Sequence, residues 1–481
     1  MAQTIASISA LLISVAMLVF GHGLQSTLLP LAASQASFSN LSIGVVSSSY
    51  FFGLVLGCLA APHVIMRAGH IRAYAAMVSL MSAAAIFHPI LVDPFSWSLI
   101  RIISGFCLAA FYMIIESWLN ERATNENRGT VMSIYIVILF GFMMIGQISI
   151  STMDITSFVP FAIASVAVSL AVMPVALTTT TQPAPIALVQ FRPVKLYRNS
   201  PAALIGTLLV GVANGALWTL APLYGTQIGL NNDQSAFYAA AIIGGGMLSQ
   251  WPIGRVSDLI DRRIVLIGIG ISTTIVALVI AFLSPTGFYM AAGLAVLIGI
   301  CSQPGYAIAV AHAFDYADPE DFLETSSGLL LSFGIGSIIG PFTASILMSQ
   351  TGPGGLYFLV AAAEIALAGF VFARMFARQA IDPEDKYDFE YAATAQVGSV
   401  ITPEPLDVDA DNVIPPEEFP AYEDAVYDPE AHEITEEVIT PEDGHGHGHG
   451  HGHGHGHLTE TEVDAEGEKA GSATGEKTDK P

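Results

Sequence analysis

Two nine-residue stretches of the sequence match each other at an offset of 192 residues: Gly23-Leu24-Gln25-Ser26-Thr27-Leu28-Leu29-Pro30-Leu31 and Gly215-Ala216-Leu217-Trp218-Thr219-Leu220-Ala221-Pro222-Leu223. Glycine, threonine, proline and two leucines occupy the same positions in both. Further matches follow at an offset of 194, where Gly105, Tyr112 and Ile145-Gly146 correspond to Gly299, Tyr306 and Ile339-Gly340. Two copies of one helical unit are therefore expected within a single chain.

The segments around these matches are apolar and long enough to cross a membrane. About 20 mostly apolar residues span ~30 Å of hydrocarbon as a helix. We expect twelve such helices, at residues 6–32, 41–66, 72–92, 97–120, 129–151, 156–177, 201–226, 235–256, 264–283, 287–312, 323–349 and 355–376. The first has no basic start and its apolar stretch runs on past Phe20 to Leu31, which predicts an uncleaved helix rather than a signal peptide. The predicted fold class is an all-α membrane protein.

Charge divides the chain near residue 380. Residues 1–380 contain 13 Lys and Arg against 14 Asp and Glu, a net charge of −1. Residues 381–481 contain 4 Lys against 27 Asp and Glu, a net charge of −23. The apolar first part excludes a single soluble globule, and no basic cluster is dense enough for a nucleic-acid binder. The second part is polar, acidic and poor in aromatic residues, which predicts a disordered tail.

The basic residues predict the orientation of the helices. Twelve of the 13 Lys and Arg before residue 381 lie in the even-numbered loops or after the last span, and the odd-numbered loops hold none. This positive-inside pattern places both termini in the cytoplasm of an inner (plasma) membrane protein. The tenth loop departs from it, with five acids between Asp315 and Glu324 and no basic residue. We interpret Asp318-Pro319 as the start of the next helix. The two ends of the bundle are called the even-loop end and the odd-loop end below.

The repeat and the charges together predict four parts. They are an N-terminal six-helix half at 1–177, a cytoplasmic linker at 178–200, a C-terminal six-helix half at 201–380 and the acidic tail at 381–481. The linker is polar and interrupted by proline, as a loop should be. Paired helices run in the same direction because six spans separate them. Two pseudo-symmetric halves with a site between them suit transport by alternating access.

Motifs in the loops after the second and eighth helices resemble those of the major facilitator superfamily. The signature is Gly-x-x-x-Asp followed by basic residues, and the second copy is complete: Gly254, Asp258, Arg262 and Arg263. The first copy lacks the acid, because Ala61 replaces it, and keeps Gly57, Arg67, Gly69 and Arg72. The resemblance implies that these loops hold an inward gate closed through an Asp–Arg pair. The missing acid removes that pairing from the first copy.

The fourth helix adds two resemblances. Arg101-Ile102-Ile103-Ser104-Gly105 is similar to the superfamily's Arg-x-x-x-Gly motif, whose arginine is associated with proton coupling. Ile115-Glu116-Ser117-Trp118-Leu119-Asn120, with Arg128-Gly129 after it, resembles the YcaD-like branch, whose substrates are poorly defined. The resemblance covers residues 1–380 and implies a twelve-helix secondary transporter.

Three charged residues inside predicted spans are candidates for proton coupling: Arg101, Glu116 and Glu364. Ionisable groups within a bilayer cost several kcal/mol unless they are paired or hydrated, so each marks a candidate site. Each also has a structural interpretation. Arg101 could extend to the outer interface, Glu116 could be a charge at the inner end of its helix, and Glu364 could be a packing partner in a peripheral helix.

Seven polar or aromatic residues are candidates for lining the solute cavity: His22, Gln25, Tyr112, Asn214, Trp218, Gln303 and Tyr306. They lie on the first, fourth, seventh and tenth spans, and the first and seventh line the cavity in the superfamily that the chain resembles. His22 stands between two glycines, and an imidazole with an ordinary pKa of about 6.5 suits solute contact or proton relay. For every one of the seven, helix packing is at least as good an explanation.

The tail contains a run of alternating glycine and histidine from Gly444 to His457. Imidazoles two residues apart can converge on Zn²⁺, Ni²⁺ or Cu²⁺. We expect a metal site at His445, His447, His449, His451, His453, His455 and His457. The alternative is an expanded repeat without a role.

The sequence predicts a secondary active transporter that exports a small organic solute, coupled to protons, by alternating access. One alternative is a transition-metal transporter whose tail gathers the ion, and another is a membrane sensor or scaffold that transports nothing. No phosphate-binding loop, zinc-protease motif or Ser/His/Asp arrangement is present, so we expect neither enzymatic activity nor a cofactor. The expected partners are the lipid bilayer, a small solute and protons, with a divalent metal at the tail and no nucleic acid.

Overall fold

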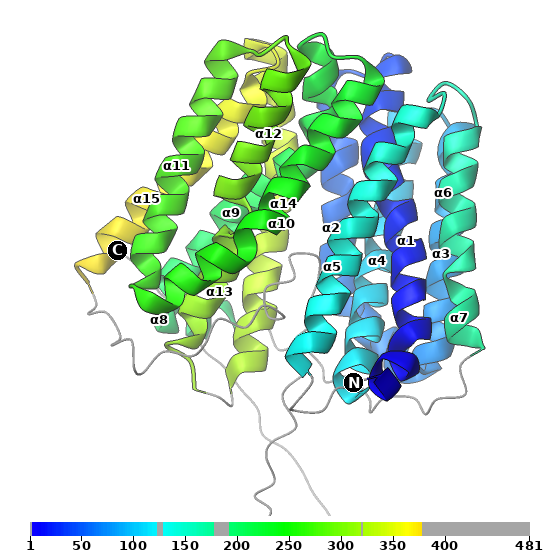
Figure 1. Cartoon of the computed structure of the whole chain (residues 1–481), viewed down its shortest axis with the longest axis horizontal. Coiled ribbons are helices and arrows are strands. Elements are labelled where there is room, and N and C mark those ends of the chain that lie inside the picture. The colour runs from blue at the N-terminus through cyan, green and yellow to red at the C-terminus, as the bar shows by residue number, and fades with distance from the viewer. Residues whose placement is uncertain (1, 123–127, 178–191, 319–320, 378–481) are drawn as a thin grey trace, which may run out of the picture. The chain divides into compact units, whose positions relative to one another are not determined.

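The computed structural model describes residues 2–122, 128–177, 192–318 and 321–377, and every regular element in these ranges is a helix (Figure 1). The elements before the linker, the N-terminal set, are α1 (Ala2–Gln35), α2 (Asn40–Ala68), α3 (His70–Ile90), α4 (Pro94–Arg122), α5 (Arg128–Ser149), the 3₁₀ turn η1 (Ile150–Thr152), α6 (Val159–Leu170) and α7 (Val172–Ala176). Those after it, the C-terminal set, are α8 (Pro193–Asn199), α9 (Pro201–Gln227), α10 (Asn232–Leu259), α11 (Arg262–Leu283), α12 (Phe288–Ser302), α13 (Gly305–Phe314), α14 (Phe322–Thr351) and α15 (Gly355–Met375). The predicted tail and most of the predicted linker lie outside the described residues.

Eleven helical segments of the described chain are long and apolar enough to cross a membrane, which confirms the all-α membrane fold. Two of the eleven are helix pairs, α6 with α7 and α12 with α13. The predicted span 235–256 corresponds to α10, which falls short in apolarity because its interior contains three successive glycines and the polar pair Ser249-Gln250. Its 28 residues still reach about 42 Å at ~1.5 Å per residue, more than the ~30 Å of a hydrocarbon core.

Two expected details differ from the structure. The span predicted at 287–312 is broken, since α12 ends at Ser302 and α13 begins at Gly305. Pro304, which lacks an N–H and clashes with the preceding turn, explains the break and leaves Gln303 beside it. The other detail is the start of α14, where Asp321 rather than Asp318 is the N-cap residue.

Glycine pairs explain the internal repeat. A Cβ on Gly105 of α4 would overlap the Tyr50 carbonyl oxygen of α2, and one on Gly299 of α12 would overlap the Ile242 carbonyl oxygen of α10. The other repeated pair behaves alike: Gly146 of α5 contacts α1 and Gly340 of α14 contacts α9 through backbone carbonyls. In both copies, the repeated glycines are the points where helix backbones touch.

The buried core shows where the two sets meet. One cluster at the odd-loop end, the joint cluster, contains residues of both sets, including Leu24 and Leu28 of α1 with Leu217 and Leu220 of α9. At the even-loop end the sets have mostly separate cores. Among the described residues, the core of the N-terminal set takes in Ile243, Leu330 and Leu331 of the other set, with Trp218, Met247 and Ile338 packed against it, and the core of the C-terminal set is its own.

Hydrogen bonds between the sets agree with this closure. Gln227 donates to the Asn40 side-chain oxygen at 2.9 Å, and the Ser48 hydroxyl donates to the Ile338 carbonyl at 2.7 Å. Asn40 and Gln227 lie at the odd-loop ends of α2 and α9. The structure is therefore closed at the odd-loop end.

Candidate functional site

Arg101 of α4 lies in a cluster with residues of α1 and α2. Its guanidinium carbon is 4.2 Å from the centre of the Tyr50 ring. Tyr50 stacks on His22, with ring centres 5.4 Å apart, and the Tyr50 hydroxyl lies 3.4 Å from His22 Nε2. The close approach of α4 to α2 at Gly105 brings the arginine over this ring. Three helices therefore hold a cation, a phenol and an imidazole together.

Arg101 is buried rather than extended to an interface, since only 5% of its surface is exposed. No acidic side chain of the described chain pairs with it, and its recorded contact is with the Tyr50 ring. A guanidinium keeps its proton in proteins, so this is a permanent charge. A buried charge without a partner costs several kcal/mol. The arginine is thus a buried charge that lacks an acidic partner among the described residues.

A small cavity of ≈ 20 Å³ adjoins Arg101. Its polar lining residues are Gln25 and Ser26 of α1, Ser47 of α2 and Thr219 of α9, so both helix sets contribute. The Gln25 amide nitrogen is buried without a hydrogen-bond partner in the described chain, and Gln147 donates to the Ser26 hydroxyl at 3.3 Å. A cavity of this size holds about one water. It is polar, charged and located where the two sets meet.

Tyr50, Ser26, Ser47, Gln147 and Thr219 were not among the expected cavity residues. The run Ser47-Ser48-Ser49-Tyr50 is a polar interruption of an apolar helix, and this could have indicated that Ser47 and Tyr50 line a cavity. Thr219 is matched by the internal repeat, which could have indicated its role. Ser26 and Gln147 have no signal in the sequence beyond being polar.

Glu116 lies nearer the other end of α4 and is only 2% exposed. The Tyr135 hydroxyl of α5 donates to its Oε1 at 3.1 Å. Fifteen residues separate it from Arg101, about 22 Å along the helix at ~1.5 Å per residue. It is therefore a buried, hydrogen-bonded carboxyl group and not an exposed charge at the end of a helix. Tyr112, one turn before it, is also fully buried, and its hydroxyl has no partner in the described chain.

The candidates of the C-terminal set form a second group. Trp218 of α9 donates to the Gln303 side-chain oxygen at 3.2 Å, beside the break between α12 and α13. Phe333 of α14 joins this group to Tyr306, with ring centres 5.8 Å from Trp218 and 5.0 Å from Tyr306. Asn214 is fully buried and neither atom of its amide has a partner in the described chain.

Glu364 of α15 stands apart from both groups. It is 0% exposed, and neither carboxyl oxygen has a hydrogen-bond partner in the described chain. Gly270 of α11 packs against its backbone. An ionised carboxylate in such a place is very costly, so the neutral acid is the form that this packing accommodates.

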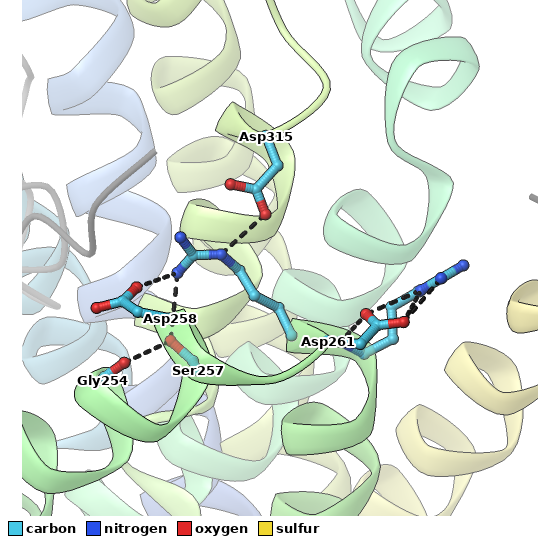
Figure 2. Close-up of polar contacts among 7 residues, drawn as sticks. Gly254, Ser257, Asp258, Asp261 and Asp315 are labelled. Atoms are coloured by element: carbon cyan, nitrogen blue, oxygen red, sulfur yellow. Dashed lines mark hydrogen bonds and ion pairs between the residues drawn. The ribbon is translucent and has the colours of Figure 1, made fainter. Parts of the chain in front are cut away.

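The loop motif after α10 is assembled around Arg262, and Figure 2 shows its partners Ser257, Asp258 and Asp315. The Arg262 guanidinium, 1% exposed, pairs with Asp315 at 2.8 Å and with Asp258 at 3.2 Å, and donates to the Ser257 hydroxyl at 3.2 Å. The Ser257 hydroxyl in turn donates to the Gly254 carbonyl at 2.7 Å. Asp315 was predicted only as part of the acidic tenth loop, and here it is the nearest partner of the motif's arginine. All these residues belong to the C-terminal set.

Arg263 has a partner of its own. Its guanidinium contacts both carboxyl oxygens of Asp261, the closest pair at 2.8 Å, and Asp261 also accepts from the Arg263 N–H as the N-cap of α11. Burial of Asp261 acts to raise its pKa, but the hydrogen bonds from Arg263 outweigh burial and leave the pKa below its ordinary value. The side chain is therefore a carboxylate at neutral pH.

The first copy of the motif forms no comparable network. Ala61, at the position of the acid, is fully buried, while Arg67 and Arg72 are exposed and pair with no acid of the described chain. Gly57 packs against Ala109 and Phe106 of α4. Gly69 has φ 81° between α2 and α3, a conformation that favours glycine. The Gly57 and Gly69 positions thus serve helix packing and chain reversal.

Besides Asp315, two acids of the tenth loop pair with basic residues near it, which accounts for part of the exception to the charge pattern. Lys195 of α8 contacts Asp321 at 2.6 Å and Glu324 at 3.6 Å, and Arg192 lies 3.8 Å from Glu324. The hydrogen bond to Asp321 raises the pKa of Lys195. The predicted metal site at 444–457 lies outside the described residues.

Comparisons with known proteins bear on the whole chain. A family model described as Major Facilitator Superfamily matches residues 11–251 and 203–406. The uncharacterized MFS-type transporter YcaD of Salmonella arizonae is 27% identical over 388 residues, covering 78% of this chain and 96% of the relative. The YcaD of Shigella flexneri is 28% identical over 384 residues, covering 77% and 95%.

Two solved structures share the fold. A mutant of the nucleoside transporter NupG has a TM-score of 0.67 at 14% identity and covers 76% of this chain and 98% of its own. A bacterial homolog of the human lysosomal transporter Spinster, in an inward-facing and occupied conformation, has a TM-score of 0.65 at 15% identity and covers 79% and 97%. The family is one of transporters and not of enzymes. The chain is a multi-pass membrane protein that belongs to the Major Facilitator Superfamily, with curated relatives named as YcaD MFS-type transporters.

Proposed function

We propose that this transporter exports a small organic solute by alternating access, that export is coupled to protons, and that the solute carries an anionic group bound at Arg101. One observation supports the site above others. A permanent positive charge is buried beside a cavity to which both helix sets contribute, and no acid of the described chain neutralises it. A solute anion would supply the missing partner, through two parallel hydrogen bonds from the guanidinium.

Arg101 itself is not the group that carries protons, because a guanidinium does not deprotonate in proteins. Its part in coupling is that of a fixed charge. Glu116 is the carboxyl group of the same helix, buried and held by Tyr135, and we assign proton binding to it. Glu364 and His22 are further candidates, the first because its carboxyl group has no partner in the described chain and the second because it adjoins Tyr50.

The proposed orientation places both termini in the cytoplasm of a bacterial inner membrane. Twelve basic residues at the even-loop end support it through the positive-inside rule. With this orientation, the joint cluster closes the outer side of the protein. A reporter fused after residue 377 that is active only in the periplasm would contradict this orientation.

The solute class can be tested with purified full-length protein. Thermal unfolding in detergent would be followed against a panel of small carboxylates, neutral solutes and amines, since a ligand that binds the folded state raises the unfolding temperature. We expect stabilisation by carboxylates, weakened about tenfold or more in Arg101→Gln because a hydrogen-bonded charge contributes ~1.5–3 kcal/mol. Arg72→Gln, which removes an exposed arginine, is the matched control. Equal responses to carboxylates and amines would refute the anion site.

Coupling is tested in proteoliposomes with a stabilising solute. An imposed pH gradient should drive solute movement in the wild type, and Glu116→Gln should abolish the dependence on the gradient while leaving binding intact. Proton coupling would be refuted if transport did not change with the pH gradient, with Glu116→Gln or with Arg101→Ala.

A second candidate function rests on the histidine run. A transition-metal transporter with a gathering tail predicts that deletion of 444–457 changes cellular tolerance to Zn²⁺ or Ni²⁺. An exporter of organic solutes predicts unchanged tolerance, so the two candidates give opposite results in one assay.

A further inference from the structure

A second cavity lies at the even-loop end of the C-terminal set, away from the cavity beside Arg101. Its walls come from five helices: the junction of α8 and α9, the start of α11, the end of α13 and the end of α15. Five polar or charged lining residues could contact a ligand: Ser200, Arg263, His312, Tyr316 and Arg374. None of them has a role in the solute site.

The cavity has an excess of positive charge. Arg374 forms no ion pair with an acid of the described chain. Arg263 is held by Asp261, which offsets its charge in part. His312 packs edge-on against Tyr316, with ring centres 5.0 Å apart, and adds a group able to donate a hydrogen bond. One uncompensated arginine and one compensated arginine therefore face the same small space.

The start of α9 adds hydrogen-bond donors. Pro201 has no N–H, and the first free backbone donors of this 27-residue helix follow it. Ser200, the N-cap residue, makes no capping bond with its side chain. It is 2% exposed, and its hydroxyl has no hydrogen-bond partner in the described chain. Buried hydroxyl groups normally have a partner, so this one indicates a ligand.

We propose that this cavity binds the phosphate group of an anionic membrane phospholipid. Donors at a helix start together with an arginine form the usual site for a phosphate group. Large apolar side chains are exposed on the same helix ends: Phe372 and Phe376 of α15 are 55% and 79% exposed, and Ile264 of α11 is 49% exposed. These helices are long and apolar enough to cross the membrane, so acyl chains can pack beside the cavity, whereas a soluble phosphate has no use for an apolar surface. Basic pockets between membrane helices bind anionic headgroups in this way.

The test uses purified full-length protein in detergent, with thermal unfolding followed against added phosphatidylglycerol, phosphatidylcholine or inorganic phosphate. Phosphatidylglycerol should raise the unfolding temperature of the wild type, whereas phosphatidylcholine should act weakly. Half-maximal stabilisation should need about tenfold more phosphatidylglycerol in Arg374→Gln and roughly fivefold more in Ser200→Ala, as expected for the loss of a charged and a neutral hydrogen bond. Arg374→Lys should restore part of the response.

Arg198→Gln is the matched control, because Arg198 is exposed, lies at the same end and does not line the cavity. An equal weakening in this control would mean unspecific attraction and overturn the site. Equal stabilisation by inorganic phosphate would overturn the lipid as its ligand. Bound lipid counted by native mass spectrometry distinguishes a variant that loses lipid from one that is merely unstable. No step involves a transported solute, so failure here leaves the proposed function standing.

Discussion

Arg101 and Tyr50 form a cation–π pair inside the membrane-spanning part of the protein, with the guanidinium carbon 4.2 Å from the ring centre. The pair joins α4 to α2 at the place where Gly105 lets the two backbones touch. The tyrosine ring partly replaces the carboxylate that usually accompanies a buried arginine. It leaves the charge itself uncancelled, and an anion can still bind to it.

Substitutions can separate the contribution of the Tyr50 ring from that of its hydroxyl group. Tyr50→Phe keeps the ring beneath Arg101 and removes the hydroxyl near His22, so binding of a stabilising anionic solute should change little. Tyr50→Leu removes the ring, and the loss of a desolvated cation–π contact should lower the free energy of unfolding by ~2 kcal/mol. Thermal unfolding without and with the solute measures stability and binding in both variants. Similar losses in the two variants would show that the hydroxyl, and not the ring, matters.

Asp315 should contribute more to stability than Asp258, although Asp258 belongs to the family motif. The Asp315 side chain is 3% exposed and that of Asp258 is 31% exposed, while both pair with the buried Arg262. Asp315→Asn should destabilise the protein by about 3 kcal/mol, as for a broken buried pair. Asp258→Asn should cost about 1 kcal/mol or less. Denaturation of the two variants shows which one loses more stability. A larger loss in Asp258→Asn than in Asp315→Asn would contradict the assigned partners.

The stability contributed by Asp261 should depend on pH. Its pKa in the folded protein lies below the ordinary value of the unfolded chain, about 3.9. The contribution is therefore fully present above pH ~4 and is lost as the pH falls through the folded pKa. Asp261→Asn keeps a good N-cap residue for α11 and removes the charge paired with Arg263, so it should cost about 1–2 kcal/mol at pH 7. The difference in the free energy of unfolding between variant and wild type should become smaller below pH ~4. A difference that does not depend on pH would exclude the carboxylate as its cause.

The repeated glycines should not tolerate a methyl group. Gly105→Ala and Gly299→Ala place a Cβ on a carbonyl oxygen of the neighbouring helix, so each should destabilise by about 1–3 kcal/mol or more. Gly141→Ala is the control, because no atom lies within 4 Å of its added Cβ, and it should be neutral or stabilising by ~0.5–1 kcal/mol. Thermal unfolding of the three variants would reveal whether backbone contact, and not helix propensity, explains the repeat.

The fold was largely predictable because every span is a long apolar run, and because three pairs of spans share repeated residues. The α10 helix was predicted as a span from its apolar run, although it is less apolar than the eleven other spans. The break at Gln303-Pro304 was missed because proline within a membrane helix often leaves it continuous, as Pro62 does in α2.

The candidate site was predictable only in part. Arg101 was found because a charge in an apolar span is conspicuous, whereas Tyr50 was not, since an aromatic residue in a helix is usually a packing residue. The pairing of Asp315 with Arg262 joins residues 53 positions apart. No local pattern indicates such a pair, and only the return of α13 to the start of α11 brings it together.

The glycine contacts limit how this protein can move. Backbones that touch at Gly105 and Gly146 in one set, and at Gly299 and Gly340 in the other, cannot slide past each other by part of a turn without steric overlap. Shear between the paired helices is thereby excluded, and the two helices of each pair move together as a rigid unit. The closed odd-loop end must then open by rocking of one helix set against the other. The contact between the sets includes α2 and α14, joined by the Ser48 hydroxyl and the Ile338 carbonyl.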